Sequence, residues 1–320
     1  MKRSLAVFLI IICLLGTRFA ICEQGKKIRL GYLQNDLHHL PCWIAMEKGF
    51  FEQEGAEVKV AGIFKAGPEE MSGFAAANLD IGYVGEAPAT TAVANRTASV
   101  VVLAQVNKEG SAIVVKRDSD IAAVVQLEGK TLAVPGYAQV QEFLLRKALS
   151  KYRVDPKRVK IIVLKPPEMI SALATSQIDA FIAWEPYPAK SITMGIGKIL
   201  LNSPQIWKDH PCCVLVADSK FLKKFPEKVR AIVRAHIKAT DFVTDSVEEA
   251  VRIGVKYTGM DEKTVRLAMR NIKYDYNPSI EGEIEYVRFL SELGYIKVEN
   301  PEGFTNRFIN TIILEGEVTK

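Results

Sequence analysis

The sequence predicts an α/β fold of two lobes, each built on a mixed, mostly parallel sheet, with a helical C-terminal segment. Strand-like and helix-like patterns alternate from residue 28 to about residue 202, which is typical of parallel sheets covered by helices. One arrangement of helix, strand and loop occurs twice in that region, which indicates two lobes. Beyond residue 220 the sequence is almost wholly amphipathic helix, and we expect these helices to pack back on the first lobe.

Each expected element follows from a hydrophobic pattern with turn residues at its ends. Short apolar runs predict strands at 28–33, 57–64, 81–84, 99–105, 131–134, 159–164 and 180–183. Helical patterns between them predict helices at 40–53, 69–77, 87–94, 139–152 and 167–174. The C-terminal segment predicts helices at 226–245, 247–258, 261–271, 280–293 and 305–314.

The repeated arrangement is a Pro–Glu start, an apolar-rich segment, an Asp that opens a short strand, and a Glu six residues after that Asp. It occurs at Pro68, Glu69, Asp80 and Glu86, and again at Pro167, Glu168, Asp179 and Glu185. Ligands of open α/β sheets bind beyond the carboxyl ends of the strands. Two such units facing each other would therefore make a two-sided site, with one side from each lobe.

Two further strand-like stretches, 112–116 and 214–217, predict where the chain crosses between the lobes. We expect them to form a two-stranded hinge. The predicted organisation is a first lobe of residues 28–107 and 220–320, a second lobe of residues 116–206, and hinge crossings at 108–115 and 207–219.

The N-terminus is typical of a secretory signal peptide. Lys2 and Arg3 precede an apolar run at 5–16, and small residues lead to Cys22. We expect residues 1–22 to be removed, with a retained anchor as the alternative, and no later stretch predicts a membrane span. Losing Lys2, Arg3 and Arg18 takes the formal net charge from +5 to +2 (5 − 3), which argues against nucleic acid or an acidic membrane surface as a partner.

Several short motifs in order along the chain resemble a known family. They are Gly31-Tyr32, the run from Pro41 to Gly55 that includes Glu47-Lys48-Gly49-Phe50-Phe51, Leu79-Asp80-Ile81-Gly82, and Asp179-Ala180-Phe181 with Trp184-Glu185-Pro186. Together they resemble the substrate-binding proteins of ABC importers, in the nitrate, sulfonate and taurine branch that also includes binders of pyrimidine-type thiamine precursors. The resemblance implies a periplasmic-binding-protein fold (type II-like) that closes on a small ligand.

The expected ligand-binding residues lie where strands end and helices begin. Glycines there let a ligand approach the backbone, and free helix amides attract anions. One of the two adjacent histidines would donate to an oxyanion, and the sequence does not say which. The full set is Gln34, His38, His39, Gly67, Gly85, Glu86, Gly136, Tyr137, Gln139, Trp184 and Glu185.

Each of these residues has a structural alternative, such as helix capping, a tight turn or core packing. Glu86 and Glu185 would bind an ammonium or a donor-rich heterocycle, and Trp184 would offer a flat wall. Many sulfonate and nitrate relatives carry Ser or Thr in the loop where this chain has Tyr137 as its only hydroxyl. That departure leaves room for an aromatic ligand.

Cys42, Cys212 and Cys213 remain after the signal peptide, so at least one thiol is unpaired. A disulfide would join Cys42 to one of the other two, because neighbouring cysteines form only a strained bridge. A soft metal site could combine His210, Cys212 and Cys213 with His39 and Cys42, but the spacings match no standard zinc pattern. We expect buried thiols, no metal and no cofactor.

The function that the sequence favours is solute binding, not catalysis. The ligand would be a small organic anion or zwitterion of the sulfonate, taurine or nitrate class, and the partners a membrane permease and, through it, a cytoplasmic ATPase. We expect a periplasmic monomer. Three alternatives stay open: a binder of a pyrimidine-type thiamine precursor, a secreted metal-binding protein, and an enzyme similar to the pyrimidine synthases.

Overall fold

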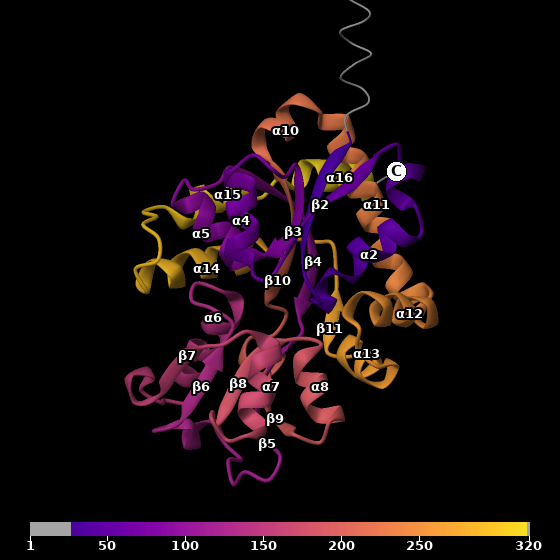
Figure 1. Ribbon diagram of the computed structural model, residues 1–320. Helices are drawn as coiled ribbons and strands as arrows, with labels where there is room; N and C mark the ends of the chain where they lie inside the picture. The colour runs from indigo at the N-terminus through magenta and orange to yellow at the C-terminus, as the bar shows by residue number, and fades with distance from the viewer. Residues whose placement is uncertain (1–26, 319–320) are drawn as a thin grey trace, which may run out of the picture.

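The computed structural model describes residues 27–318 as two lobes, each built on its own sheet (Figure 1). The first lobe is the six-stranded sheet with its helices, and the second lobe is the five-stranded sheet with its helices. The predicted signal peptide, residues 1–22, lies outside the described residues. Within residues 27–318 no helix has the length and apolar character needed to cross a membrane.

The first sheet has the spatial order β11-β4-β10-β3-β1-β2. Strand β1 pairs in parallel with β2 and β3, whereas β10 runs antiparallel to β3 and β4, and β11 antiparallel to β4. The strands are β1 (Ile28–Leu33), β2 (Val58–Phe64), β3 (Ile81–Gly85), β4 (Val100–Glu109), β10 (Pro211–Asp218) and β11 (Ile272–Tyr274).

The second sheet has the order β7-β6-β8-β5-β9. Its strands are β5 (Ser111–Lys116), β6 (Thr131–Val134), β7 (Lys160–Val163), β8 (Ala180–Trp184) and β9 (Gly197–Asn202). Strand β6 is parallel to β7 and β8, and β5 is antiparallel to β8 and β9. Both sheets are mixed, as predicted. Antiparallel pairing is more extensive than expected, because the strands next to the crossings run against their neighbours.

The chain crosses between the sheets at two places. Strand β4 ends at Glu109 and β5 begins at Ser111, so Gly110 alone joins the two sheets, with a φ of +84° that favours glycine. The return passes from β9 through α9 (Ser203–Ile206) into β10. Away from these crossings, the backbone N–H of Leu37 in the first lobe donates to the carbonyl of Glu185 in the second (3.2 Å).

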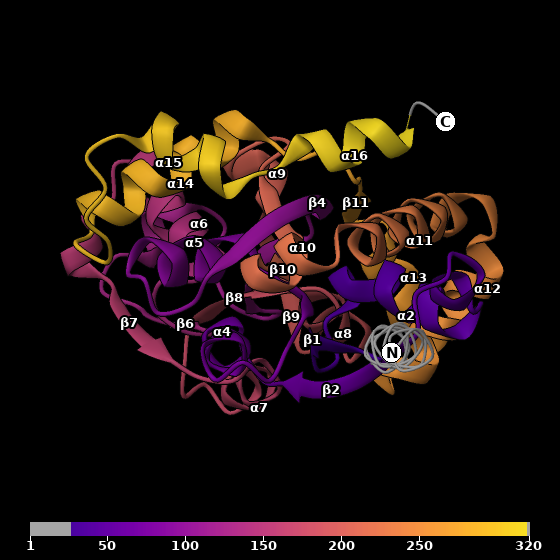
Figure 2. The ribbon, with the colours of Figure 1, turned by 90° about the horizontal axis from the view of Figure 1, so that it is seen from above.

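Helices cover both faces of each sheet (Figures 1 and 2). One face of the first sheet carries η1 (Leu37–His39), α2 (Leu40–Glu47), α3 (Phe50–Gln53), α11 (Pro226–Asp245), α12 (Val247–Thr258) and α16 (Thr311–Val318). The other face carries α4 (Gly67–Ala75), α5 (Glu86–Ala94), α14 (Ile280–Glu292) and α15 (Pro301–Phe308), while α10 (Ser219–Lys224) follows β10. The second lobe contains η2 (Val124–Leu127), α6 (Val140–Lys151), η3 (Pro156–Arg158), α7 (Pro166–Ala174) and α8 (Tyr187–Thr193).

The C-terminal helices pack on the first lobe and also contact the second. Helix α13 (Glu262–Met269) packs on α8 of the second lobe, where the hydroxyls of Thr193 and Thr264 lie 2.6 Å apart. Helix α14 meets α6 through Phe143, whose ring centroid lies 4.3 Å from that of Phe289 and 4.7 Å from that of Tyr286. These contacts hold the lobes together on two sides of the crossings.

The repeated arrangement found in the sequence is α4-β3-α5 in the first lobe and α7-β8-α8 in the second. Its Asp residues have the same structural task in both. The carboxylate of Asp80 accepts from the backbone N–H of Arg29 at the start of β1 (2.8 Å), and that of Asp179 accepts from the N–H of Thr131 at the start of β6 (2.8 Å). Each Asp therefore ties a strand to its parallel neighbour, at the amino ends of the two strands.

Most predicted elements are confirmed within a few residues, and the differences have local causes. The helix expected at 40–53 is two helices, because Gly49 adopts a φ of +65° between them. The helix expected at 305–314 is the α15–α16 pair, which is interrupted at Ile309 and Asn310. Strands β9 and β11 were not predicted; β11 has only three residues and lies within a largely helical region.

Candidate functional site

A small cavity of about 20 Å³ lies between the lobes. Its walls come from both sides: Leu33, Asp36, His38, Gly67, Gly85, Pro88, Cys212 and Cys213 from the first lobe, and Gln139, Val140, Gln141 and Trp184 from the second. A space of this size holds about one water-sized occupant. The lobes are therefore closed tightly upon each other in this conformation.

Several helices begin at the cavity. Gly67 is the first residue of α4, Gly85 precedes α5, and Gln139 precedes α6, while Trp184 ends the strand before α8. Free N–H groups and the positive end of the helix dipole attract negative charge at such positions. Since α4 and α5 belong to the first lobe and α6 to the second, closure brings helix N-termini from both lobes to one point.

Tight backbone packing accompanies this convergence. A Cβ on Gly67 would lie 2.7 Å from the Pro88 side chain, and one on Gly136 would overlap the Gln139 amide. A Cβ on Gly85 would come within 4.0 Å of Val140 in the opposite lobe. Close approach of the Pro88 ring therefore favours glycine at position 67, whereas the Gln139 side chain could move away from position 136 and position 85 has nearly ordinary contacts.

His38 is the residue of the adjacent histidine pair that lines the cavity. Its Nε2 lies 2.9 Å from the carbonyl oxygen of Gly110 and donates to it, so Nδ1 is the ring nitrogen left for the neighbouring side chains. Around Nδ1 lie Asp36 Oδ1 at 3.5 Å, Cys212 Sγ at 3.4 Å and Cys213 Sγ at 3.7 Å. All four side chains are at most 2% exposed.

The charges of this cluster support one another. Burial alone would lower the pKa of His38, but the neighbouring Cys212 and Asp36 raise it to about 9. Hydrogen bonding to Cys213 and the charge of His38 lower the pKa of Cys212 well below its usual value, whereas burial raises the pKa of Asp36 to about 7. The cavity floor therefore holds an imidazolium beside a thiolate.

His39 points elsewhere. Its Nδ1 accepts from the backbone N–H of Leu33 (3.1 Å), so Nε2 carries the proton, and among the described residues that buried N–H finds no acceptor. Its ring lies 6.1 Å from that of Tyr83. Burial and the charge of His38 hold the pKa of His39 well below its usual value, so His39 is neutral.

Glu86 is buried in the first lobe and does not line the cavity. Its Oε2 accepts from Gln105 Nε2 (3.2 Å), and it lies beside Glu283 of α14, which accepts from the Thr90 hydroxyl (2.8 Å). Burial raises the pKa of Glu86 to about 7 and that of Glu283 well above its usual value. This carboxyl pair joins α5 to α14.

Glu185 is also fully buried and likewise does not line the cavity. Its Oε2 accepts from the backbone N–H of Ala189 (3.0 Å), and its Oε1 accepts from Asn271 Nδ2 (2.7 Å). Burial raises the pKa of Glu185 to about 7, although both hydrogen bonds act in the opposite direction. Because Asn271 follows α13, Glu185 connects the second lobe to the C-terminal helices.

The predicted site residues thus divide into two groups. His38, Gly67, Gly85, Gln139 and Trp184 line the cavity. The others do not line it: Gln34 and Tyr137 are exposed, Gly136 packs on Gln139, and His39, Glu86 and Glu185 are buried nearby. The sequence analysis did not place Leu33, Asp36, Pro88, Val140, Gln141, Cys212 or Cys213 among the ligand-binding residues.

The three cysteines of the described region are free and buried, as predicted. Two groups of side chains could hold a metal ion, with donor atoms within 4.8 Å of one another: His38 with Cys212 and Cys213, and Asp36 with His39 and Cys213. His210 and Cys42, which the sequence suggested as partners, belong to neither group. His210 Nδ1 lies 3.0 Å from the carbonyl oxygen of Pro211.

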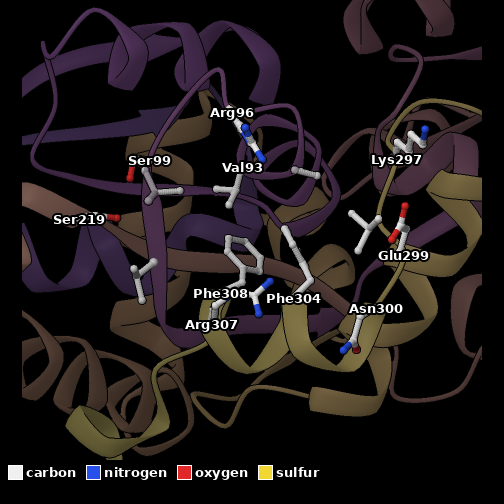
Figure 3. A pocket seen from close by; sticks show the side chains of 14 residues that line it. Val93, Arg96, Ser99, Ser219, Lys297, Glu299, Asn300, Phe304, Arg307 and Phe308 are labelled. Atoms are coloured by element: carbon white, nitrogen blue, oxygen red, sulfur yellow. The ribbon is translucent and has the colours of Figure 1, made fainter.

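A wider groove of about 550 Å³ lies on the first lobe, between the start of β4 and α15 (Figure 3). Arg96, Lys297 and Arg307 give it positive charge, and Phe304 and Phe308 form an apolar floor. The groove is lined entirely by first-lobe residues, so movement of the lobes cannot enclose a ligand there. We therefore place the candidate site in the cavity between the lobes.

Comparisons with known proteins show the family to which the chain belongs. A family model described as the NMT1-like family matches residues 23–255. A Bacillus subtilis protein named as an aliphatic sulfonates-binding protein is 32% identical over 242 residues, which covers 72% of this chain and 70% of the relative. The Escherichia coli taurine-binding periplasmic protein is 29% identical over 194 residues, covering 60% of this chain and 59% of the relative.

The fold is also that of solved structures. The periplasmic nitrate-binding protein NrtA from Synechocystis superposes with a TM-score of 0.81 over 92% of this chain and 88% of that chain, at 17% sequence identity. At that identity the similarity concerns the arrangement of the two lobes and not the chemistry between them.

Proposed function

The chain belongs to the NMT1-like family, and on this premise we propose that it is the solute-binding component of an ABC importer. Its relatives and structural neighbours include proteins named for binding sulfonates, taurine and nitrate. We infer the same general class of ligand, a small organic anion or zwitterion. The protein would act outside the cytoplasm and deliver its ligand to a membrane permease coupled to an ATPase.

The observation that carries the proposal is the cavity itself. It lies between the lobes, it is lined from both, and helix N-termini from both lobes begin there. An anion held at this point would bridge the lobes and stabilise the closed state, because only the closed state presents both sets of N–H groups. The indole of Trp184 offers an apolar wall for the organic part, and its buried Nε1–H has no acceptor among the described residues.

The cavity of about 20 Å³ is too small for an organic sulfonate in this conformation. Ligand entry would require the lobes to separate, which moves α6 away from α4 and α5. With a ligand bound, the lobes would then lie farther apart than they do in this conformation. This is a hinge motion about the two crossings, of the kind that binding proteins of this shape use.

The surroundings favour an anion over a pyrimidine-type thiamine precursor. The two carboxyls that could bind ring amino groups are already engaged, Glu86 with Gln105 and Glu185 with Asn271 and a backbone N–H. The helix N-termini that begin at the cavity supply N–H donors instead, which suit an anion. We propose that the protein binds and releases its ligand unchanged, as a monomer, and is not an enzyme.

A thermal-shift screen tests the proposal, because a ligand that binds only the folded state raises the melting temperature. Taurine, alkanesulfonates, nitrate and aminopyrimidines would be compared. We expect a sulfonate or taurine to raise the melting temperature of the wild type and of Gln34→Ala, and to have little effect on Gln139→Ala. The two variants change the same residue type, but only Gln139 lines the cavity.

Three results would contradict the proposal. The first is no response to any anion. The second is a response only to an aminopyrimidine, which would support the thiamine-precursor alternative. The third is an equal loss of the shift in both glutamine variants, which would move the site away from the cavity. Conversion of a panel compound by the protein under substrate excess would contradict the non-enzyme reading.

A further inference from the structure

We propose that His38, Cys212 and Cys213 form a binding site for a zinc-type cation at the floor of the cavity between the lobes, with Asp36 as the fourth donor. The sequence analysis expected no metal and considered only a different set of partners for the cysteines. The structure instead places His38, Cys212 and Cys213 with donor atoms within 4.8 Å of one another, and Asp36 Oδ1 lies 3.5 Å from His38 Nδ1. All four side chains are at most 2% exposed.

The measured distances match the edges of a tetrahedral metal centre. With a metal–nitrogen bond of about 2.1 Å and a metal–sulfur bond of about 2.3 Å, a tetrahedral ion separates nitrogen from sulfur by about 3.6 Å, and nitrogen from oxygen by about 3.4 Å. His38 Nδ1 lies 3.4 Å from Cys212 Sγ, 3.7 Å from Cys213 Sγ and 3.5 Å from Asp36 Oδ1. The spacings from the histidine nitrogen are therefore those of a tetrahedral zinc centre.

The histidine is oriented as a metal ligand usually is. Its Nε2 donates to the carbonyl of Gly110 at 2.9 Å, so Nδ1 is the ring nitrogen that would bind the ion after losing its proton. The position of this carbonyl depends on glycine, since a Cβ on Gly110 would overlap the His38 ring, and the φ of +84° disfavours other residues. Gly110 thus holds His38, the proposed metal ligand, in its orientation.

An irregularity in β10 brings the two cysteines to the same histidine. Consecutive side chains of a regular strand point to opposite faces of the sheet. Against β4 the register of β10 shifts between Pro211 and Cys213 and again between Cys213 and Val214. Such bulges redirect side chains and are common at functional sites. Here the bulge allows Sγ atoms of neighbouring residues to approach one nitrogen.

The donor set selects the kind of ion. Two thiolates and an imidazole favour zinc and other borderline or soft cations, whereas magnesium and calcium prefer oxygen ligands only. The four residues also line the cavity, whose volume of about 20 Å³ suits a single ion or water molecule. The site would therefore remain accessible to a ligand that enters between the lobes.

Titration of the purified protein with cobalt(II), a spectroscopic substitute for zinc, tests the proposal. The protein would first be treated with a chelator and a non-thiol reductant. We expect one equivalent of cobalt per chain, with a thiolate-to-cobalt charge-transfer band and the intense visible bands of a tetrahedral centre, and displacement by zinc. Removing a residue that only hydrogen-bonds to a metal ligand usually weakens metal binding by roughly 10- to 100-fold. Cys212 and Cys213 are proposed to bind the metal directly, so Cys212→Ser and Cys213→Ser should each weaken cobalt binding by about 100-fold or more.

Cys42→Ser is the matched control, because Cys42 is equally buried but lies outside the cluster. It should bind cobalt as the wild type does. A wild type without the charge-transfer band would overturn the proposal, and this decides the matter even if a serine variant fails to fold. A band that survives in both Cys212→Ser and Cys213→Ser, or that is lost in Cys42→Ser, would overturn it as well. The measurement uses no organic ligand, so its result is independent of the proposed transport function.

Discussion

Replacing Glu185 by glutamine should change how stability depends on pH. Glu185 is fully buried, and burial raises its pKa from the usual value of 4.5 to about 7. The folded protein therefore binds this proton more tightly than the unfolded chain does. The carboxyl has no destabilising effect at pH 4, becomes increasingly destabilising between about pH 4.5 and pH 7, and reaches its full effect above pH 7. At 1.36 kcal/mol per pKa unit, the full effect is about 3 kcal/mol.

Glutamine has nearly the same shape but does not titrate. Its side-chain oxygen can accept from the N–H of Ala189, and its amide group can donate to Asn271 after that side chain turns its amide over. We therefore expect the free energy of unfolding of Glu185→Gln, relative to the wild type, to rise by about 3 kcal/mol between pH 4 and pH 8. Asp36 and Glu86 also titrate near pH 7, but they do so in both proteins and cancel in the difference.

Urea unfolding at several pH values, followed by circular dichroism, measures this difference. Glu52→Gln provides the control, because Glu52 lies exposed on α3 and its replacement should give a nearly constant difference across the range. A flat profile for Glu185→Gln would refute the reasoning. A profile that falls as the pH rises would show that the folded protein holds Glu185 ionised, stabilised by its two hydrogen bonds.

Three further substitutions test contacts within and between the lobes. Gly110→Ala should destabilise the protein by more than Gly129→Ala in thermal unfolding. Both glycines have positive φ values, +84° and +74°, so the backbone alone should cost about 1–3 kcal/mol at each position, but only a Cβ at position 110 would collide with His38. Equal losses of stability would contradict the contact with His38. Phe143→Ala removes a ring between α6 and α14 and should lower the free energy of unfolding by about 3–5 kcal/mol; a loss below about 1 kcal/mol would mean that the lobes do not pack on each other there. Asp80→Ala should lower the free energy of unfolding by about 1–3 kcal/mol in urea, because it leaves the backbone N–H of Arg29 at the start of β1 without its acceptor. An unchanged free energy of unfolding would contradict the structural role assigned to the repeated Asp.

The sequence was most informative where local pattern decides the structure. Helices α11 and α12 begin and end where the amphipathic pattern predicts, because each buries one face along its whole length. The repeat around Asp80 and Asp179 was also real, but its Asp residues serve strand pairing and not the site. A recurring motif indicates a recurring local structure, and the role of its residues depends on which other parts of the chain contact them.

The residues that contact such a motif come from distant parts of the chain, and this limited how well the site could be predicted. Glu86 and Glu185 were expected at the ligand, but Glu283 and Asn271, from the C-terminal segment, lie beside them. Similarly, the approach of Cys212 and Cys213 to His38 depends on a shift in strand register. No spacing between residues in the sequence reveals such a shift.

Gly110 has a consequence for how the protein could signal its own state. It is the single residue between β4 of one sheet and β5 of the other, and its carbonyl accepts a hydrogen bond from His38 in the cavity. Rotating one sheet against the other turns this carbonyl, so the angle between the lobes and the environment of the His38 ring are energetically linked. Such linkage acts equally in both directions. A molecule or ion in the cavity that fixes the His38 ring would favour one angle between the lobes. A partner protein that binds the lobes at that angle would in turn raise the affinity for the bound molecule or ion.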